Sequence, residues 1–155
     1  MCDNRMPERL KGKIYKTVIR PVMLYGSETW TMLENDTRKA ATAETRMLRW
    51  STGKTLKDRV RNEVTLAKVK VRKIEDKLRA QRLRWFGHVE RRDNDYCGKL
   101  ASNVQVQGGK RKIGGQRRRW RDVIKNDMIT CETSKNIAQD RDAWRKMLTR
   151  MADPS

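Results

Sequence analysis

Apolar residues recur every three or four positions along most of the chain, which is the spacing of α-helices, and few stretches alternate as strands do. The first apolar stripe predicts a helix over residues 10–25. Pro21 is expected to kink or split this helix because it lacks a backbone N–H, and Gly26 is expected to end it. The members of the stripe are Leu10, Ile14, Val18, Val22 and Tyr25.

Capping residues mark the starts of the next two predicted helices. Asn35 or Asp36 can cap the first of them, and Gly53 is expected to stop it. Thr55 is expected to begin the second, with Asp58 bonding back to it as in a capping box. The apolar stripe of the first of these helices contains Ala40, Ala43, Met47 and Trp50.

Residues 69–91 predict one longer helix with two stripes of different character. The apolar positions fall within about 60° of one another at 100° per residue, and they would face a core. Cations occupy a neighbouring sector, so this helix would present a row of charges to phosphates. The apolar stripe contains Val71, Ile74, Leu78, Trp85 and Val89. The row of cations contains Lys70, Lys73, Lys77, Arg84 and Arg91.

Residues 93–118 lose this periodicity and are rich in glycine, which predicts a flexible joint ending in basic residues. Apolar spacing then predicts one helix from Trp120 to Met128 and a last one from Trp144 to Met151. The expected fold is all-α, a loosely packed helical chain in two lobes joined by a Gly-rich basic linker. Its segments would be a helical region over 1–92, the joint over 93–118 and a helical hairpin over 119–155.

Positive charge is concentrated in two stretches. The chain carries a net charge of +19, of which residues 68–92 and 110–125 contribute +7 each. Each stretch also holds a tryptophan between arginines, Trp85 and Trp120. Clustered Lys and Arg release counterions from a phosphate backbone, and aromatic rings can stack on bases. The pattern predicts RNA or DNA as the partner, with a solvated helix face as the alternative.

Several classes of protein are disfavoured by the sequence. No stretch is apolar enough to span a membrane, and the N-terminus does not follow the pattern of a signal peptide. The three cysteines are an odd number and widely spaced, which indicates reduced thiols. We therefore expect an intracellular protein, nuclear or cytoplasmic, with no membrane partner and no small-molecule substrate.

Five blocks of sequence stand out in their order and spacing. They lie at residues 14–30, 47–50, 58–62, 82–92 and, as a pair, 119–122 with 140–145. These blocks resemble the thumb and C-terminal region that follows the polymerase palm in reverse transcriptases of non-LTR, LINE-type retrotransposons, and the resemblance covers roughly residues 10–150. One departure lies in the basic joint, where Gly114-Gly115-Gln116-Arg117 stands in place of the family's Gly-Arg-Pro.

The resemblance implies a region that grips template and primer while RNA is copied into DNA. In this family the paired carboxylates that hold the catalytic metal ions lie upstream, in the palm. No Asp-Asp pair occurs in this chain, and its acids are expected to cap helices and form ion pairs. We therefore expect no catalytic residue, metal, cofactor or enzymatic activity in the chain alone, and a polymerase palm as a further partner.

The single histidine and the aromatic residues have structural explanations as well as functional ones. His88 is in line with the apolar stripe of 69–91 and is expected to be packed or to cap a helix. Cys97 and Cys131 lack the short spacings of a zinc site. Trp120 is left open between core packing and base stacking. The tryptophans expected in the core are Trp50, Trp85 and Trp144.

The nucleic-acid-binding residues predicted from the two basic stretches are Lys70, Lys73, Lys77, Arg84, Arg91, Lys110, Arg111, Lys112, Arg117, Arg118, Arg119, Trp120 and Arg121. Two alternatives stay open. One is a helical protein-interaction module, in which the apolar stripe of 69–91 pairs with a partner helix. The other is the residual product of a decayed mobile element.

Replacing Arg117, Arg118, Arg119 and Arg121 by glutamine should reduce the slope of log RNA affinity against log salt concentration, because fewer counterions are released. The reduction should correspond to at most about four phosphate contacts. Filter-binding titrations over a series of salt concentrations measure this slope. A slope equal to that of the unmodified chain would reject the assignment.

Overall fold

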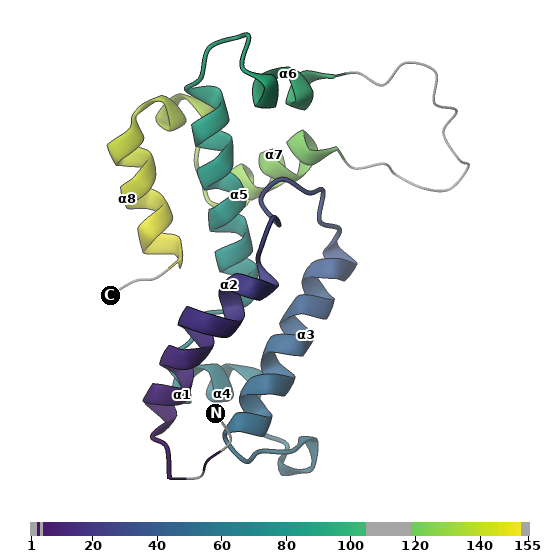
Figure 1. The fold of residues 1–155 in the computed structure, drawn as a ribbon, viewed down its shortest axis with the longest axis vertical. Helices are drawn as coiled ribbons and strands as arrows, with labels where there is room; N and C mark the ends of the chain where they lie inside the picture. The colour runs from purple at the N-terminus through teal and green to yellow at the C-terminus, as the bar shows by residue number, and fades with distance from the viewer. Residues whose placement is uncertain (1–2, 4, 105–118, 153–155) are drawn as a thin grey trace, which may run out of the picture. The chain divides into compact units, whose positions relative to one another are not determined.

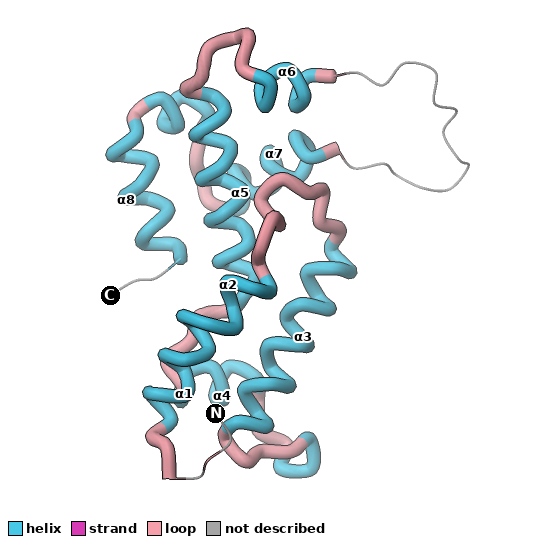
Figure 2. The backbone as a smooth tube through the Cα atoms, viewed as in Figure 1, coloured by secondary structure: helices cyan, strands magenta, loops and turns pink. Residues whose placement is uncertain are grey.

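The computed structural model describes residues 3, 5–104 and 119–152, and these contain helices and no strand (Figures 1 and 2). The all-α prediction is confirmed. No helix in this part of the chain is long and apolar enough to cross a bilayer. The elements are α1 (Glu8–Ile14), the π-helical turn η1 (Tyr15–Ile19), α2 (Arg20–Met23), α3 (Glu34–Ser51), the 3-10 turn η2 (Leu56–Asp58), α4 (Asn62–Lys68), α5 (Ile74–Glu90), α6 (Cys97–Asn103), α7 (Trp120–Thr130), the 3-10 turn η3 (Lys135–Gln139) and α8 (Arg141–Ala152).

The chain divides into two compact units. Unit 1 comprises residues 1–27 and 34–78, and unit 2 comprises 28–33 and 79–155. This division differs from the predicted segments, because its boundary falls within α5. The N-terminal end of α5 bonds to residues of unit 1, whereas its later turns supply core residues to unit 2. The predicted joint contains α6, and its remaining residues, 105–118, lie outside the described residues.

A buried carboxylate, Glu44 of α3, organises unit 1. It accepts hydrogen bonds from the Tyr15 hydroxyl at 2.9 Å and the Arg20 guanidinium at 2.6 Å. The backbone N–H of Ile74, the first residue of α5, donates to the same carboxylate at 2.9 Å. Burial, reinforced by the charge of Glu44, raises the pKa of Tyr15 far above its usual range, so the phenol remains a donor. One side chain therefore joins α2, α3 and the start of α5.

The prediction that the apolar stripe of residues 10–25 faces a core is wrong. Val22 is 77% exposed and Tyr25 is 89% exposed. Pro21 offers no N–H and its ring crowds the carbonyl four residues earlier, and the helix widens into η1 just before it. The wider turn changes the side-chain register, and Tyr15 and Arg20 occupy the buried face. The exposed members of the stripe are Leu10, Val18, Val22 and Tyr25.

The predicted apolar face of α3 is also displaced. Trp50 is 72% exposed, so its assignment to the core is wrong, whereas Glu44 and Arg49 are buried. Arg49 donates to the carbonyl of Val60 and, at 2.8 Å, to Oδ1 of Asn62. Hydropathy cannot indicate the buried face here, because charged side chains with satisfied hydrogen bonds occupy it.

The helix predicted to begin at Thr55 is a single 3-10 turn. Gly53 has a φ of +67° and ends α3 as predicted. Asp58 accepts a hydrogen bond from the backbone N–H of Thr55 at 2.6 Å, which holds the pKa of this carboxyl below its usual range. The capping interaction is therefore confirmed, although it begins a 3-10 turn and not an α-helix.

The helix predicted over 69–91 begins later, at Ile74. Lys70 has a left-handed backbone conformation, with a φ of 53°, which breaks the helical path after α4. Lys70 and Lys73 therefore precede α5. The prediction that these cations form one row along a single helix is therefore wrong.

Unit 2 packs α7 and α8 against α5 through the apolar residues predicted for them. Trp144 is 2% exposed, so its core assignment is confirmed. Asp127 of α7 accepts from Arg82 through both carboxylate oxygens, at 2.7 and 3.0 Å, and Arg79 lies 3.5 Å from it. This paired geometry fixes α7 on α5. The buried core residues are Leu83, Phe86, Ile124, Ala138, Trp144 and Leu148.

Replacing Glu44 by glutamine should destabilise unit 1 by about 3–5 kcal/mol, because the buried Arg20 loses its counter-charge. Urea denaturation followed by peptide-resolved hydrogen exchange measures the loss in this unit. Glu34→Gln provides the matched control, since Glu34 forms an exposed pair with Arg38 at 3.5 Å and its loss should have little effect. Equal effects of the two substitutions would contradict the role given to Glu44.

Candidate nucleic-acid interface

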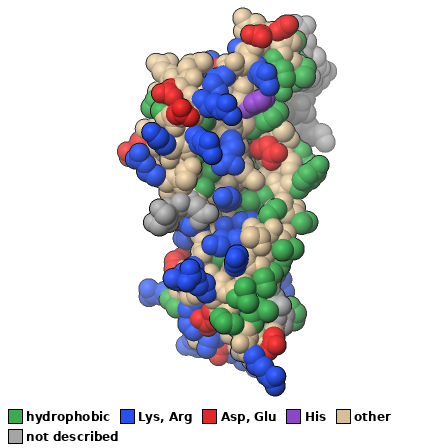
Figure 3. Space-filling model, turned by 60° about the vertical axis from the view of Figure 1, so that its left-hand side comes forward, with side chains coloured by type: hydrophobic (Ala, Val, Ile, Leu, Met, Phe, Trp, Pro, Cys, Tyr) green, Lys and Arg blue, Asp and Glu red, His purple; other side chains and the backbone are tan. Residues whose placement is uncertain are grey.

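A groove lined on two sides by arginines lies between α5 and α8 in unit 2. Its volume is about 900 Å³. Figure 3 shows Lys and Arg side chains, in blue, beside the chain's one histidine, in purple. The charged lining consists of Arg84, Arg91 and Arg92 from α5 and the residues after it, and Arg141 and Arg145 from α8. The rest of the lining is His88, Trp144, Leu148 and Thr149.

A close helix contact brings the two sets of arginines together. α8 lies beside α5 (Figure 1), and the indole N–H of Trp144 donates to the carbonyl of Leu83 at 3.0 Å. A Cβ atom at Gly87 would lie 2.5 Å from Nε1 of Trp144. Glycine inside a helix lowers its stability, but here any side chain would push α8 away. Gly87 therefore permits the groove to form.

The groove arginines are available for an anion. No carboxylate lines the groove, and within the described residues none of its five arginines forms an ion pair. Arg91 donates to the carbonyl of Ala138 at 2.6 Å, and the guanidinium of Arg92 lies 5.7 Å from the ring centroid of Tyr96. Guanidinium groups bind phosphate through paired hydrogen bonds and stack on planar rings. This arrangement can hold several phosphate charges.

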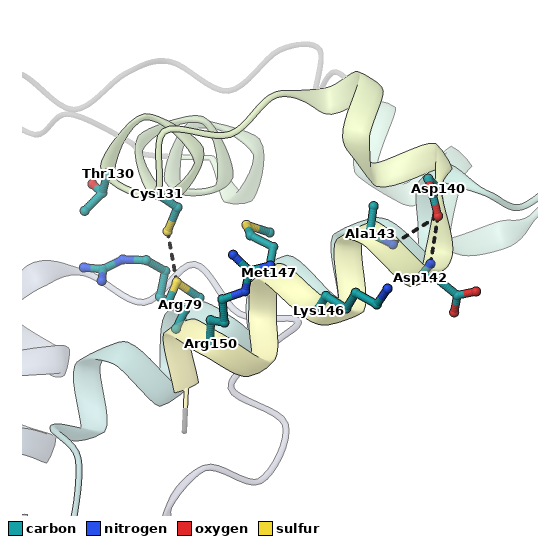
Figure 4. Close-up of a pocket in the computed structure, with 10 residues that line it drawn as sticks. Arg79, Thr130, Cys131, Asp140, Asp142, Ala143, Lys146, Met147 and Arg150 are labelled. Carbon is teal, nitrogen blue, oxygen red and sulfur yellow. Dashed lines mark hydrogen bonds between the residues drawn. The ribbon is translucent and has the colours of Figure 1, made fainter. Parts of the chain in front are cut away.

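The opposite face of α8 has a different character. A second cavity there, of about 660 Å³, mixes acids, bases and methionines (Figure 4). Asp140 accepts from the backbone N–H groups of Asp142 at 2.9 Å and Ala143 at 3.1 Å, and so caps α8. Cys131 Sγ lies 3.1 Å from Met151 Sδ. Charges of both signs line this cavity, so it offers less to an anion than the arginine groove does.

The lysines predicted to bind phosphate belong to unit 1, whereas the groove residues belong to unit 2. Lys70 and Lys73 are exposed, and Lys77 is half-buried on α5. Lys73 pairs with Glu63 at 3.3 Å. The backbone N–H of Glu63 and then Lys73 hold the pKa of that carboxyl below its usual range. The structure therefore does not bring these lysines into the arginine groove.

Two of the predicted residues, Arg84 and Arg91, line the groove. Arg119 is exposed at the start of α7. Arg121 donates to Ser102 Oγ at 3.2 Å and lies 3.8 Å from the carboxylate of Glu90. The predicted residues outside the described ones are Lys110, Arg111, Lys112, Arg117 and Arg118.

The tryptophan of the second basic stretch belongs to the core of unit 2. Trp120 is half-buried against the core residue Phe86, with ring centroids 6.3 Å apart, and its indole N–H donates to the carbonyl of Glu28 at 2.8 Å. Of the two possibilities left open by the sequence, core packing describes its position. Its predicted contact with a base stays a prediction.

Sequence reasoning missed three of the groove arginines, Arg92, Arg141 and Arg145. The available signal was helical spacing, because 141 and 145 are four residues apart and share a face of α8. His88, expected to be packed, is half-buried and lines the groove. The described residues contain no cluster of three or more His, Cys, Asp or Glu side chains that could hold a metal ion, and within them neither Cys97 nor Cys131 forms a disulfide.

In sequence comparison the chain is 23% identical to an uncharacterized transposon-derived protein of Caenorhabditis elegans, over 96% of this chain. The chain spans 57% of that protein's length. This similarity supports a mobile-element origin. No protein-family model and no solved structure matches the chain.

The Gly87→Ala substitution should destabilise unit 2 by about 1–3 kcal/mol, although alanine favours helices, because the new methyl group collides with Trp144. Urea denaturation followed by circular dichroism measures the change. In a chain that also carries Trp144→Phe, which has a smaller ring, Gly87→Ala should destabilise unit 2 less. A Gly87→Ala chain that is more stable than the unmodified one would contradict the close contact.

Proposed function

We propose that the chain is a nucleic-acid-binding region of a non-LTR retrotransposon reverse transcriptase and acts on RNA or DNA without catalysing polymerisation itself. The observation that carries this proposal is the arginine groove of unit 2. Among the described residues, five arginines line it and no carboxylate does. Phosphate is the anion that nucleic acids present repeatedly, and arginine binds it through two hydrogen bonds at once.

The sequence supports the same assignment. Residues 110–125, which include the start of α7, contribute a further net charge of +7. The blocks that resemble the post-palm region of LINE-type reverse transcriptases include residues 82–92 and 140–145, and both segments supply groove arginines. A relative described as transposon-derived agrees with this class of protein.

A second function, docking onto protein, is favoured by a separate observation in unit 1. Val18 in η1, Val22 in α2 and Tyr25 in the turn after α2 are exposed, with exposed fractions of 60%, 77% and 89%. Exposed apolar rows of this kind commonly mark protein contacts. The polymerase palm is the partner that the family resemblance suggests. This surface and the arginine groove belong to different units, so the two functions are compatible.

Removing two groove charges should weaken nucleic-acid binding in a salt-dependent way. The double substitution Arg141→Gln and Arg145→Gln should reduce the slope of log affinity against log salt by about 1.5, at roughly 0.7–0.9 for each lost phosphate contact. Fluorescence anisotropy with a labelled RNA at several salt concentrations gives this slope.

The matched control removes two charges from the other face of the same helix. Lys146→Gln with Arg150→Gln changes the net charge equally, but these residues line the second cavity. We expect a slope close to that of the unmodified chain. If both pairs reduce the slope equally, the groove has no special role, and if neither chain nor variants bind RNA or DNA at physiological salt, the proposed function fails.

A further inference from the structure

We propose that the groove selects single-stranded nucleic acid, with its phosphates between the arginines of α5 and α8 and one base stacked on Trp85. This inference rests on the proposed function and specifies its ligand. It also assigns a binding role to a tryptophan that the sequence placed in the core.

Trp85 differs from its neighbours in unit 2 because it does not belong to the core cluster. Trp120 and Trp144 pack in that cluster, and Trp85 does not. It is half-buried, so part of its indole remains exposed. It is not among the lining residues of the groove but lies about 100° around α5 from Arg84, a groove residue, and three residues before His88, which also lines the groove. A partly exposed aromatic ring at the border of a positively charged groove is well placed to meet a base.

Aromatic contacts connect Trp85 to the groove itself. Its indole stacks on the ring of His88, with centroids 5.4 Å apart and an interplanar angle of 20°, and His88 lines the groove. The rings of His88 and Tyr96 are nearly perpendicular, with centroids 6.1 Å apart. Arg92, which also lines the groove, lies over Tyr96. A small aromatic cluster therefore borders the arginines, and its stacking limits the positions that Trp85 can adopt.

A single strand fits this combination better than a duplex. Single-strand binding sites pair a positive groove, which follows the backbone, with aromatic rings, on which the bases stack. In a duplex the bases stack on one another, so their faces are not available to Trp85. The arginines stand on two walls, and one backbone lying between them can be contacted from both sides. The groove volume of about 900 Å³ is toward the upper end of the range for ligand pockets, which leaves room for more than one phosphate.

The test compares three ligands at one salt concentration with the full chain. They are a single-stranded RNA of about 12 nucleotides, within the usual range of such sites, a blunt duplex of the same sequence, and linear inorganic polyphosphate as a competitor without bases. We expect the single strand to bind at least about tenfold more tightly than the duplex. Trp85→Leu should weaken single-strand binding roughly five- to hundredfold and leave duplex and polyphosphate binding nearly unchanged.

Two further variants make the result specific. Trp85→Phe keeps a stacking ring and should recover much of the affinity, whereas Trp50→Leu removes an exposed tryptophan of unit 1 and should change nothing. Unchanged duplex and polyphosphate binding by Trp85→Leu also shows that the groove remains folded.

Equal affinity for single strand and duplex, unaltered by Trp85→Leu, would overturn this inference. So would equal losses from Trp85→Leu and Trp50→Leu. In either case the proposed function survives if Arg141→Gln with Arg145→Gln still lowers the salt slope. If none of the three ligands binds, this inference and the proposed function are both wrong.

Discussion

The contact between Gly87 of α5 and Trp144 of α8 is the constraint on which the candidate site depends. The indole occupies the space that a Cβ atom at Gly87 would need, and its N–H bonds to the carbonyl of Leu83. This places Arg141 and Arg145 of α8 opposite the arginines of α5. Bringing like charges together is unfavourable, so the apolar packing of Trp144 must offset that repulsion. An anion bound between the helices would relieve it.

Buried carboxylates decide which cations remain for binding. In unit 2, Asp127 draws Arg82 into the interior, where it is 6% exposed, although this arginine lies in one of the two basic stretches. In unit 1, Glu44 does the same to Arg20. Charge along the sequence is therefore a poor guide to charge on the surface. The groove arginines stand out because no carboxylate in the described part of the chain pairs with them.

The sequence predicted the helical fold, the apolar faces of α7 and α8, and two of the five groove arginines, because these follow from local spacing. It failed where tertiary contacts override that spacing. Val18 and Val22, on either side of Pro21, are exposed because the π-helical turn shifts the side-chain register, and Trp50 is exposed because α3 buries Glu44. Helix propensity gives no reason for a glycine at position 87 of α5, and only the packing of Trp144 supplies one.

The most direct test of this account is ultraviolet cross-linking of the full chain to single-stranded RNA, followed by mass spectrometry of the linked peptides. If α5 and α8 form one phosphate-binding groove, adducts will occur both within residues 82–92, including Trp85, and within residues 141–149. Adducts confined to unit 1, or absent from both of these segments, would contradict the groove as the site of nucleic-acid binding.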